Sequence, residues 1–158
     1  MALRAKMKWS AIVVLLIFVV LQFWRPAHTN PPVDSAQTLA ATAAVPSEVS
    51  AVFARSCNDC HSNTTNWRWY TYVAPTSWFT IDHVNKGREE LNFSEWGRYR
   101  KRTKETRLRA ICAQCRSGEM PLTSYTFVHR EAKLSPDEVK LICTWTENVQ
   151  KELEARVP

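Results

Sequence analysis

The sequence lacks three kinds of pattern, and each absence narrows what the chain can be. No stretch shows the alternating apolar and polar residues of a β-strand, and no segment repeats another. Without strands, the βαβ surroundings of a thioredoxin-like site are excluded. Acidic residues are also in the minority, with 15 Asp and Glu against 21 Lys and Arg, which gives a net charge of +6. The fold class expected is therefore all-α, in a basic protein.

Residues 1–27 have the composition of a targeting segment. Three basic residues precede a continuous apolar run at 11–21. The apolar segment, of about 15 residues, lies between a signal peptide and a full span of about 20. Small residues that would allow cleavage are lacking at 23–26, so we predict an uncleaved single-pass anchor in the inner membrane, with a cleaved signal as the alternative. The basic residues place the N-terminus in the cytoplasm and the remainder in the periplasm.

Residues 28–46 are small, polar and proline-bearing, which predicts a flexible linker. Residues 47–158 then form one domain of about 110 residues, near the usual domain size. A basic exported domain is expected to meet an acidic partner protein or anionic headgroups, and no nucleic acid.

Helical periodicity and end signals place four helices in this domain. One begins near Ser47 and runs directly into Cys57, a second covers 77–91, and a third covers 94–117 and ends at Gly118. The last has the clearest start, because 135–138 reads Ser-Pro-Asp-Glu, a capping box with proline at the first helical position.

The pentapeptide at 57–61, Cys-Asn-Asp-Cys-His, is the Cys-x-x-Cys-His signature of covalent haem attachment. Two thiols three residues apart on a helical turn can reach both vinyl groups at one porphyrin edge, and the next residue can direct its imidazole at the iron. A zinc site that also uses Cys112 and Cys115 is the strongest competitor. Arg116 stands where a second haem motif would need histidine, so one haem c is expected.

The second axial ligand is predicted to be Met120. It lies in a loop before Pro121, and a thioether favours ferrous iron and raises the reduction potential. An ordinary core methionine is the alternative reading. His83 and His129 are rival ligands that would give a lower potential.

Several blocks in order resemble the bacterial haem-binding domain family with a single Cys-x-x-Cys-His motif. The resemblance covers about 45–150, and these blocks carry it: Cys57-x-x-Cys60-His61-Ser62, Asn66-Trp67-x-Trp69-Tyr70, Ala74-Pro75-x-Ser77-Trp78, Gly87-Arg88, Asn92-Phe93-Ser94-x-Trp96, Gly118-x-Met120-Pro121, Tyr125, His129, Ala132-x-Leu134-Ser135 and Trp145. The resemblance implies covalent haem binding and an exported location. The chain departs from the family pattern at Cys115, where an aliphatic residue is usual.

The expected fold also resembles small class I cytochromes c. That resemblance implies an N-terminal helix ending in the haem motif, crossed by the C-terminal helix with Phe53 and Trp145 in contact. It also suggests that the Pro75 carbonyl accepts the Nδ1 proton of His61, and that Trp69 or Tyr70 reaches the haem propionates.

The function predicted is single-electron transfer in the periplasm to a membrane-associated redox partner, by a carrier rather than an enzyme. A haem peroxidase or a haem-based gas or redox sensor with an open distal site is the alternative. Cys112 and Cys115 fall on an apolar helix face, which favours buried thiols, while a disulfide between them or to Cys143 is also open.

Overall fold

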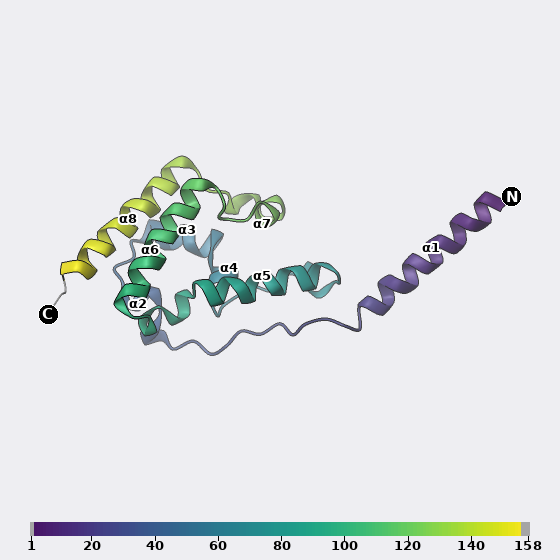
Figure 1. The fold of residues 1–158 in the computed structure, drawn as a ribbon, viewed down its shortest axis with the longest axis horizontal. Helices are drawn as coiled ribbons and strands as arrows, with labels where there is room; N and C mark the ends of the chain where they lie inside the picture. The colour runs from purple at the N-terminus through teal and green to yellow at the C-terminus, as the bar shows by residue number, and fades with distance from the viewer. Residues whose placement is uncertain (1, 156–158) are drawn as a thin grey trace.

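The computed structural model describes residues 2–155, and all regular secondary structure in that range is helical (Figure 1). The α-helices are α1 (Ala2–Leu21), α2 (Leu39–Thr42), α3 (Ser47–Ser56), α4 (Asn58–His61), α5 (Thr76–Glu90), α6 (Lys101–Ser117), α7 (Thr123–Val128) and α8 (Pro136–Ala155). The 3-10 helices are η1 (Ser35–Gln37), η2 (Trp69–Tyr72), η3 (Phe93–Arg98) and η4 (Arg130–Ala132). The all-α prediction is confirmed for the described range.

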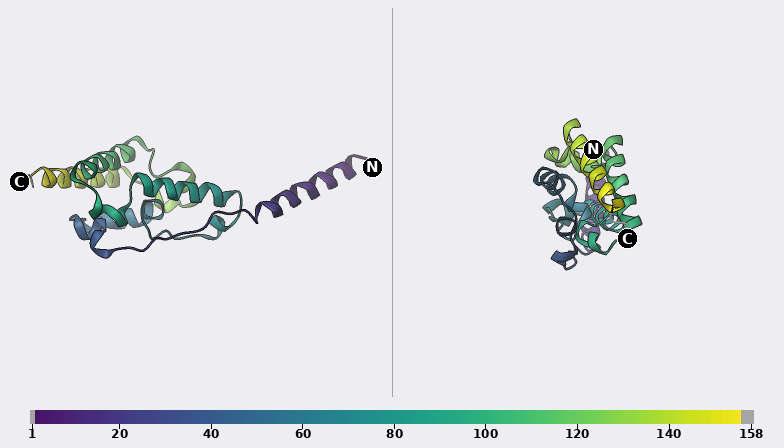
Figure 2. Two further views of the ribbon diagram at one scale, coloured as in Figure 1. Left: turned by 60° about the horizontal axis from the view of Figure 1, so that its bottom comes forward. Right: turned by 90° about the vertical axis from the view of Figure 1, so that its left-hand side faces the viewer.

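The core lies between α3, α6 and α8, and α6 and α8 run side by side (Figures 1 and 2). Leu108 and Ile142 are fully buried at this contact. Phe53 of α3 meets Trp145 of α8 edge-to-face, with ring centroids 5.3 Å apart, so the predicted aromatic pair at the helix crossing is confirmed.

The start of α8 follows the predicted capping box. The Glu138 amide donates to the Ser135 hydroxyl at 3.2 Å, and the Ser135 amide donates to the Glu138 carboxylate at 2.8 Å. Hydrogen bonding to the Ser135 amide, together with Arg55 at 2.7 Å, lowers the pKa of Glu138 below its usual value. The carboxylate thus joins the cap of α8 to α3.

The predicted helix over 94–117 is two elements. η3 and α6 are separated by Tyr99 and Arg100, whose backbones are extended at φ −70°, ψ 137° and φ −65°, ψ 153°. The break allows Trp96 to be buried at 1% exposure while the Tyr99 hydroxyl turns back to accept from the Asn92 amide at 2.8 Å. The predicted end is confirmed, because Gly118 ends α6 at φ 75°.

A disulfide joins α6 to α8. Cys112 and Cys143 are bonded with their Cα atoms 4.8 Å apart, while Cys57, Cys60 and Cys115 are free thiols. The preferred reading of Cys112 as a buried thiol is therefore wrong, because its side chain faces α8. This bond also removes Cys112 from the zinc alternative, and no cluster of three or more metal-binding side chains occurs within residues 2–155.

The segment 28–46 packs on the domain, in contrast to the flexible linker predicted from its composition. His28 donates to the Thr71 carbonyl at 2.9 Å and stacks on Tyr72 with ring centroids 4.1 Å apart. Leu39, on α2, is only 4% exposed and joins the core. These contacts come from residues distant in sequence, so the composition of the segment alone did not reveal them.

The helix α1 projects from the body of the molecule (Figures 1 and 2). Among the helices formed by residues 2–155, none combines the length and apolarity needed to cross a membrane. The predicted transmembrane anchor is therefore not supported.

Candidate cofactor cleft

Two neighbouring cavities, of about 320 and 180 Å³, form one cleft in the body of the domain. Both are lined by Cys57, His61 and Met120, so three of the four predicted site residues meet there. Cys60 lines the smaller cavity, which completes the set. The remaining wall of the larger cavity is mainly apolar and includes Phe93 and Ile111. Its size falls within the usual range for small-molecule sites.

The motif at 57–61 is built as a single tight turn at the end of α3. Cys57 is both the last cap of α3 and the first cap of α4. Its carbonyl accepts from the Cys60 amide at 3.1 Å and from the His61 amide at 3.0 Å. This turn brings Cys57, Cys60 and His61 to the cleft.

The orientation of His61 is set by the C-terminal end of α5. Its Nδ1 lies 3.0 Å from the carbonyl oxygens of both Gly87 and Leu91, and carbonyls only accept, so Nδ1 carries the proton. Nε2 then keeps its lone pair free for a metal. Burial lowers the pKa of His61, which further favours the neutral ring. The predicted acceptor, the Pro75 carbonyl, is wrong, because the carbonyls of Gly87 and Leu91 at the end of α5 fill that role, the Gly87 carbonyl while also accepting from the Leu91 amide at 2.8 Å.

Gly87 allows α5 to approach the motif closely. A Cβ built on Gly87 would lie 2.6 Å from the Cys60 carbonyl oxygen, well inside van der Waals contact. Glycine is therefore required for packing here, despite its unfavourable helix propensity.

Arg88, the next residue, fixes the chain on either side of the motif. Its Nε donates to the Ser62 carbonyl at 2.8 Å, and its terminal nitrogens donate to the Thr29 carbonyl at 2.7 Å and the Thr65 hydroxyl at 2.8 Å. The segment before the domain and the loop after His61 are thus tied to one guanidinium group.

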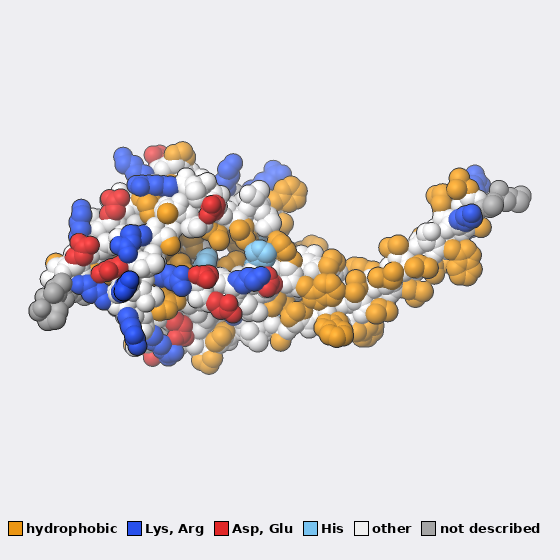
Figure 3. Space-filling model, in the orientation of Figure 1, with side chains coloured by type: hydrophobic (Ala, Val, Ile, Leu, Met, Phe, Trp, Pro, Cys, Tyr) orange, Lys and Arg blue, Asp and Glu red, His pale blue; other side chains and the backbone are white. Residues whose placement is uncertain are grey.

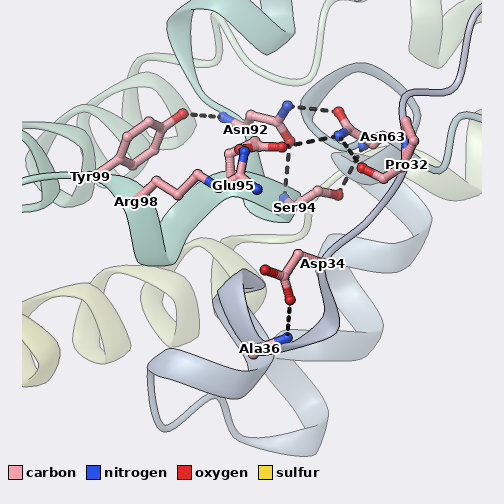
Figure 4. A network of polar contacts seen from close by, with 9 residues as sticks. All are labelled: Pro32, Asp34, Ala36, Asn63, Asn92, Ser94, Glu95, Arg98 and Tyr99. Atoms are coloured by element: carbon pink, nitrogen blue, oxygen red, sulfur yellow. Dashed lines mark hydrogen bonds and ion pairs between the residues drawn. The ribbon is translucent and has the colours of Figure 1, made fainter.

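A buried polar network holds the same loop against η3 (Figure 4). The Asn92 side chain donates to Asn63 Oδ1 at 2.8 Å and accepts from the Ser94 amide at 2.9 Å. The Asn63 amide donates to the Ser94 hydroxyl at 3.0 Å. Asn63 Nδ2 also lies 3.4 Å from the Pro32 carbonyl, so the network reaches the segment 28–46 as well.

The thiols at the cleft are protonated at neutral pH. Burial raises the pKa of Cys57, with nearby Cys115 and Cys60 adding to the effect. Burial also raises the pKa of Cys60 to about 11 and that of Cys115 to about 11. Cys115 lines the larger cavity, so this position lies at the site itself.

Met120 approaches the cleft from the turn that follows α6. Its amide donates to the Gln114 carbonyl at 3.1 Å, which folds the chain back after Gly118. Of the rival ligands, His83 lines the smaller cavity and bonds through Nδ1 to the Phe79 carbonyl at 2.7 Å. His129 lines neither cavity, and its Nε2 bonds to the Tyr70 hydroxyl at 2.7 Å.

The aromatic residues named for propionate contacts lie elsewhere. Trp69 is 78% exposed, and with Tyr70 it lines a third cavity, of about 350 Å³, beyond Cys60. The cation on the wall of the larger cavity is Arg107, which pairs with Glu90 at 2.7 Å. The sequence did not single out Arg107, because seven basic residues lie between 98 and 109. Sequence alone does not show which of them points toward the cleft.

The residues of the cleft fit a haem. The walls are mainly apolar, His61 lines the space with Nε2 left free of the hydrogen bonds that occupy Nδ1, and the Met120 thioether lines it too. Ser56 also lines both cavities, and its buried hydroxyl has no hydrogen-bond partner among residues 2–155, which leaves it available to a bound group.

Comparison with known proteins agrees with this geometry. Residues 16–148 match the model of the haem-binding domain family, a range that runs from the end of α1 into α8. No curated protein and no solved structure matches the chain. Because the match covers well over half of the sequence, the chain belongs to the haem-binding domain family.

Proposed function

We propose that the chain carries one covalent haem c and transfers single electrons. Thioether bonds from Cys57 and Cys60 would hold the haem, with His61 and Met120 as its axial ligands. The observation that carries the proposal is that an imidazole and a thioether line both cavities together with Cys57, and that Cys60 joins them at the smaller cavity. When bound, the haem supplies a one-electron couple between ferric and ferrous iron.

The residues around the cleft give the site its properties. The Gly87 and Leu91 carbonyls hold the His61 ring in one tautomer, and their hydrogen bonds make the Nε2 lone pair a stronger ligand for iron. Phe53, Phe93 and Ile111 exclude water from the larger cavity. Arg107, at the wall of that cavity, offers the positive charge that a propionate needs.

The proposed location is the periplasmic side of the inner membrane, reached through the N-terminal targeting segment. The disulfide between Cys112 and Cys143 supports export, because such bonds persist in oxidising compartments. The proposed partner is a membrane-associated redox protein. Fractionation of cells and a reporter fused after Ala155 would test the location. A cytoplasmic reporter signal would contradict it.

Spectroscopy tests the haem and its ligands directly. The chain expressed with a haem-attachment apparatus should gain the mass of one haem and give a low-spin spectrum with a methionine–iron charge-transfer band. Met120→Ala should convert the spectrum to high-spin, while Met7→Ala on the exposed face of α1 should leave it unchanged. A colourless product would end the haem c proposal, and an unchanged Met120→Ala spectrum would end the axial assignment.

A second function is possible if Met120 does not bind the iron, because a small molecule could then bind at that position. The smaller cavity and the third cavity share Cys60, His83, Leu122 and Tyr125, so a small molecule that enters the third cavity comes next to the site. A high-spin spectrum in the unmodified protein that responds to peroxide or carbon monoxide would favour a peroxidase or a sensor over a carrier.

A further inference from the structure

We propose that α1, the groove at its junction with α5, and exposed aromatic side chains of the body form one continuous surface that binds anionic lipid. This inference goes beyond the haem function, because it assigns a binding surface to residues outside the cleft. Its consequence is that the body lies against a bilayer in one fixed orientation.

The apolar part of α1 is exposed on every side. Every residue from Ile12 to Val20 has an exposed side chain, with values between 42% and 66%. Residues on all faces of a helix cannot be covered by packing one face on the body. A helix that is apolar all round needs apolar surroundings, which the body does not supply, and Figure 3 shows hydrophobic side chains continuing from α1 onto the adjoining end of the body.

The C-terminal end of α1 is fastened to the body by specific hydrogen bonds. The Gln22 side chain donates to the Ala74 carbonyl at 3.2 Å and accepts from the Ala74 amide at 3.0 Å. The Trp78 indole donates to the Trp24 carbonyl at 2.6 Å, and Arg25 donates to the Tyr72 carbonyl. Bonds at three points hold residues 22–25, directly after α1, on the body, so the base of the helix and the body meet a surface together.

An apolar groove lies at this junction. It has a volume of about 600 Å³ and is lined by Val20, Leu21, Phe23, Trp24, Pro26 and Trp78. Its walls come from both α1 and α5, with no charged side chain among them. An apolar groove at the base of an apolar helix suits a lipid acyl chain.

The aromatic and basic residues match the layers of a bilayer surface. Phe23 and Trp24 are 86% and 82% exposed. On the body, Tyr72, which lines a cavity with Phe23, and Phe79, which follows Trp78 in α5, are about half exposed. Trp and Tyr favour the boundary between hydrocarbon and headgroups. Basic residues flank the apolar run at both ends, with Arg25 at the junction, which favours anionic headgroups.

The test uses the full, haem-loaded chain with vesicles of phosphatidylcholine containing phosphatidylglycerol. A nitroxide label would be placed by Phe79→Cys on the proposed surface and, as the matched control, by Arg109→Cys on the exposed side of α6. We expect the protein to float with the vesicles. The ratio of oxygen to water-soluble nickel accessibility should rise several-fold at residue 79 and stay unchanged at residue 109.

A second variant tests the hydrogen bonds between Gln22 and Ala74 that hold the end of α1 on the body. Gln22→Ala should still float through α1, but the label at residue 79 should return to the accessibility of a water-exposed site. Failure to float, or equal accessibility at residues 79 and 109 in floated protein, would overturn the inference. The visible spectrum of the same samples reports on the haem, so failure of the cofactor proposal is distinguishable from failure of the lipid surface.

Discussion

Replacing Gly87 with alanine tests whether the close contact between α5 and the motif sets the site. The added Cβ would lie 2.6 Å from the Cys60 carbonyl oxygen and 3.2 Å from the Cys60 Cβ, so α4 and α5 must separate. Overpacking of this kind costs about 1–3 kcal/mol. Alanine in place of glycine within a helix gains about 1 kcal/mol. The net expectation is a loss of up to about 2 kcal/mol in the free energy of unfolding.

The assay is urea unfolding of the haem-free and haem-loaded protein, with absorbance spectra of the loaded form. Asn85→Ala is the control, because Asn85 is exposed on the same helix and should gain up to about 0.7 kcal/mol from propensity alone. Gly87→Ala should also shift the haem spectrum, since the Gly87 carbonyl accepts from His61. A Gly87→Ala protein that is more stable than the parent, with an unaltered spectrum, would refute the reasoning.

Four further predictions concern stability. Replacing Cys112 and Cys143 together by alanine should lower the free energy of unfolding by about 3.7 kcal/mol, from the entropy of a closed loop of their 31-residue separation; urea unfolding that matches the parent would contradict this. Leu108→Ala, at a position with 0% exposure, should cost about 2–5 kcal/mol in the same assay, and a smaller loss would mean that the core closes over the cavity. Ser135→Ala should cost about 1 kcal/mol by loss of the cap. The pKa of Glu138 is lowered in the folded state, so its contribution is fully present above about pH 4.3 and is lost as the pH falls through the folded pKa. Glu138→Gln should therefore destabilise more at pH 7 than at pH 3, and equal effects at both would contradict the assignment.

Local signals predicted the parts of the fold that local contacts form. The capping box at Ser135 needs only residues within one helical turn, and it forms as expected. The turn at 57–61 is likewise local. Phe53 and Trp145 were paired through a resemblance to known folds, and their contact is present.

The parts that were missed depend on distant residues. The acceptors for His61 lie 26 and 30 positions away along the chain, and only the direction of α5 brings its last carbonyls there. The segment 28–46 reads as a linker because its side chains are small, yet Leu39 is buried and Ala44 accepts from the Trp145 indole at 2.9 Å. The sequence also left the disulfide partner of Cys112 undetermined, because that partner depends on α6 packing against α8.

The pairing of Cys112 with Cys143 gives the number of thiols that each form of the protein should expose when it is unfolded without reductant. The haem-free chain retains Cys57, Cys60 and Cys115, so titration should count three. In the haem-loaded chain Cys57 and Cys60 are thioethers, so only the Cys115 thiol should be counted. The oxidation that forms the Cys112–Cys143 disulfide must therefore leave Cys57 and Cys60 reduced. A count of one thiol in colourless protein would identify chains in which Cys57 and Cys60 had formed a disulfide before haem attachment.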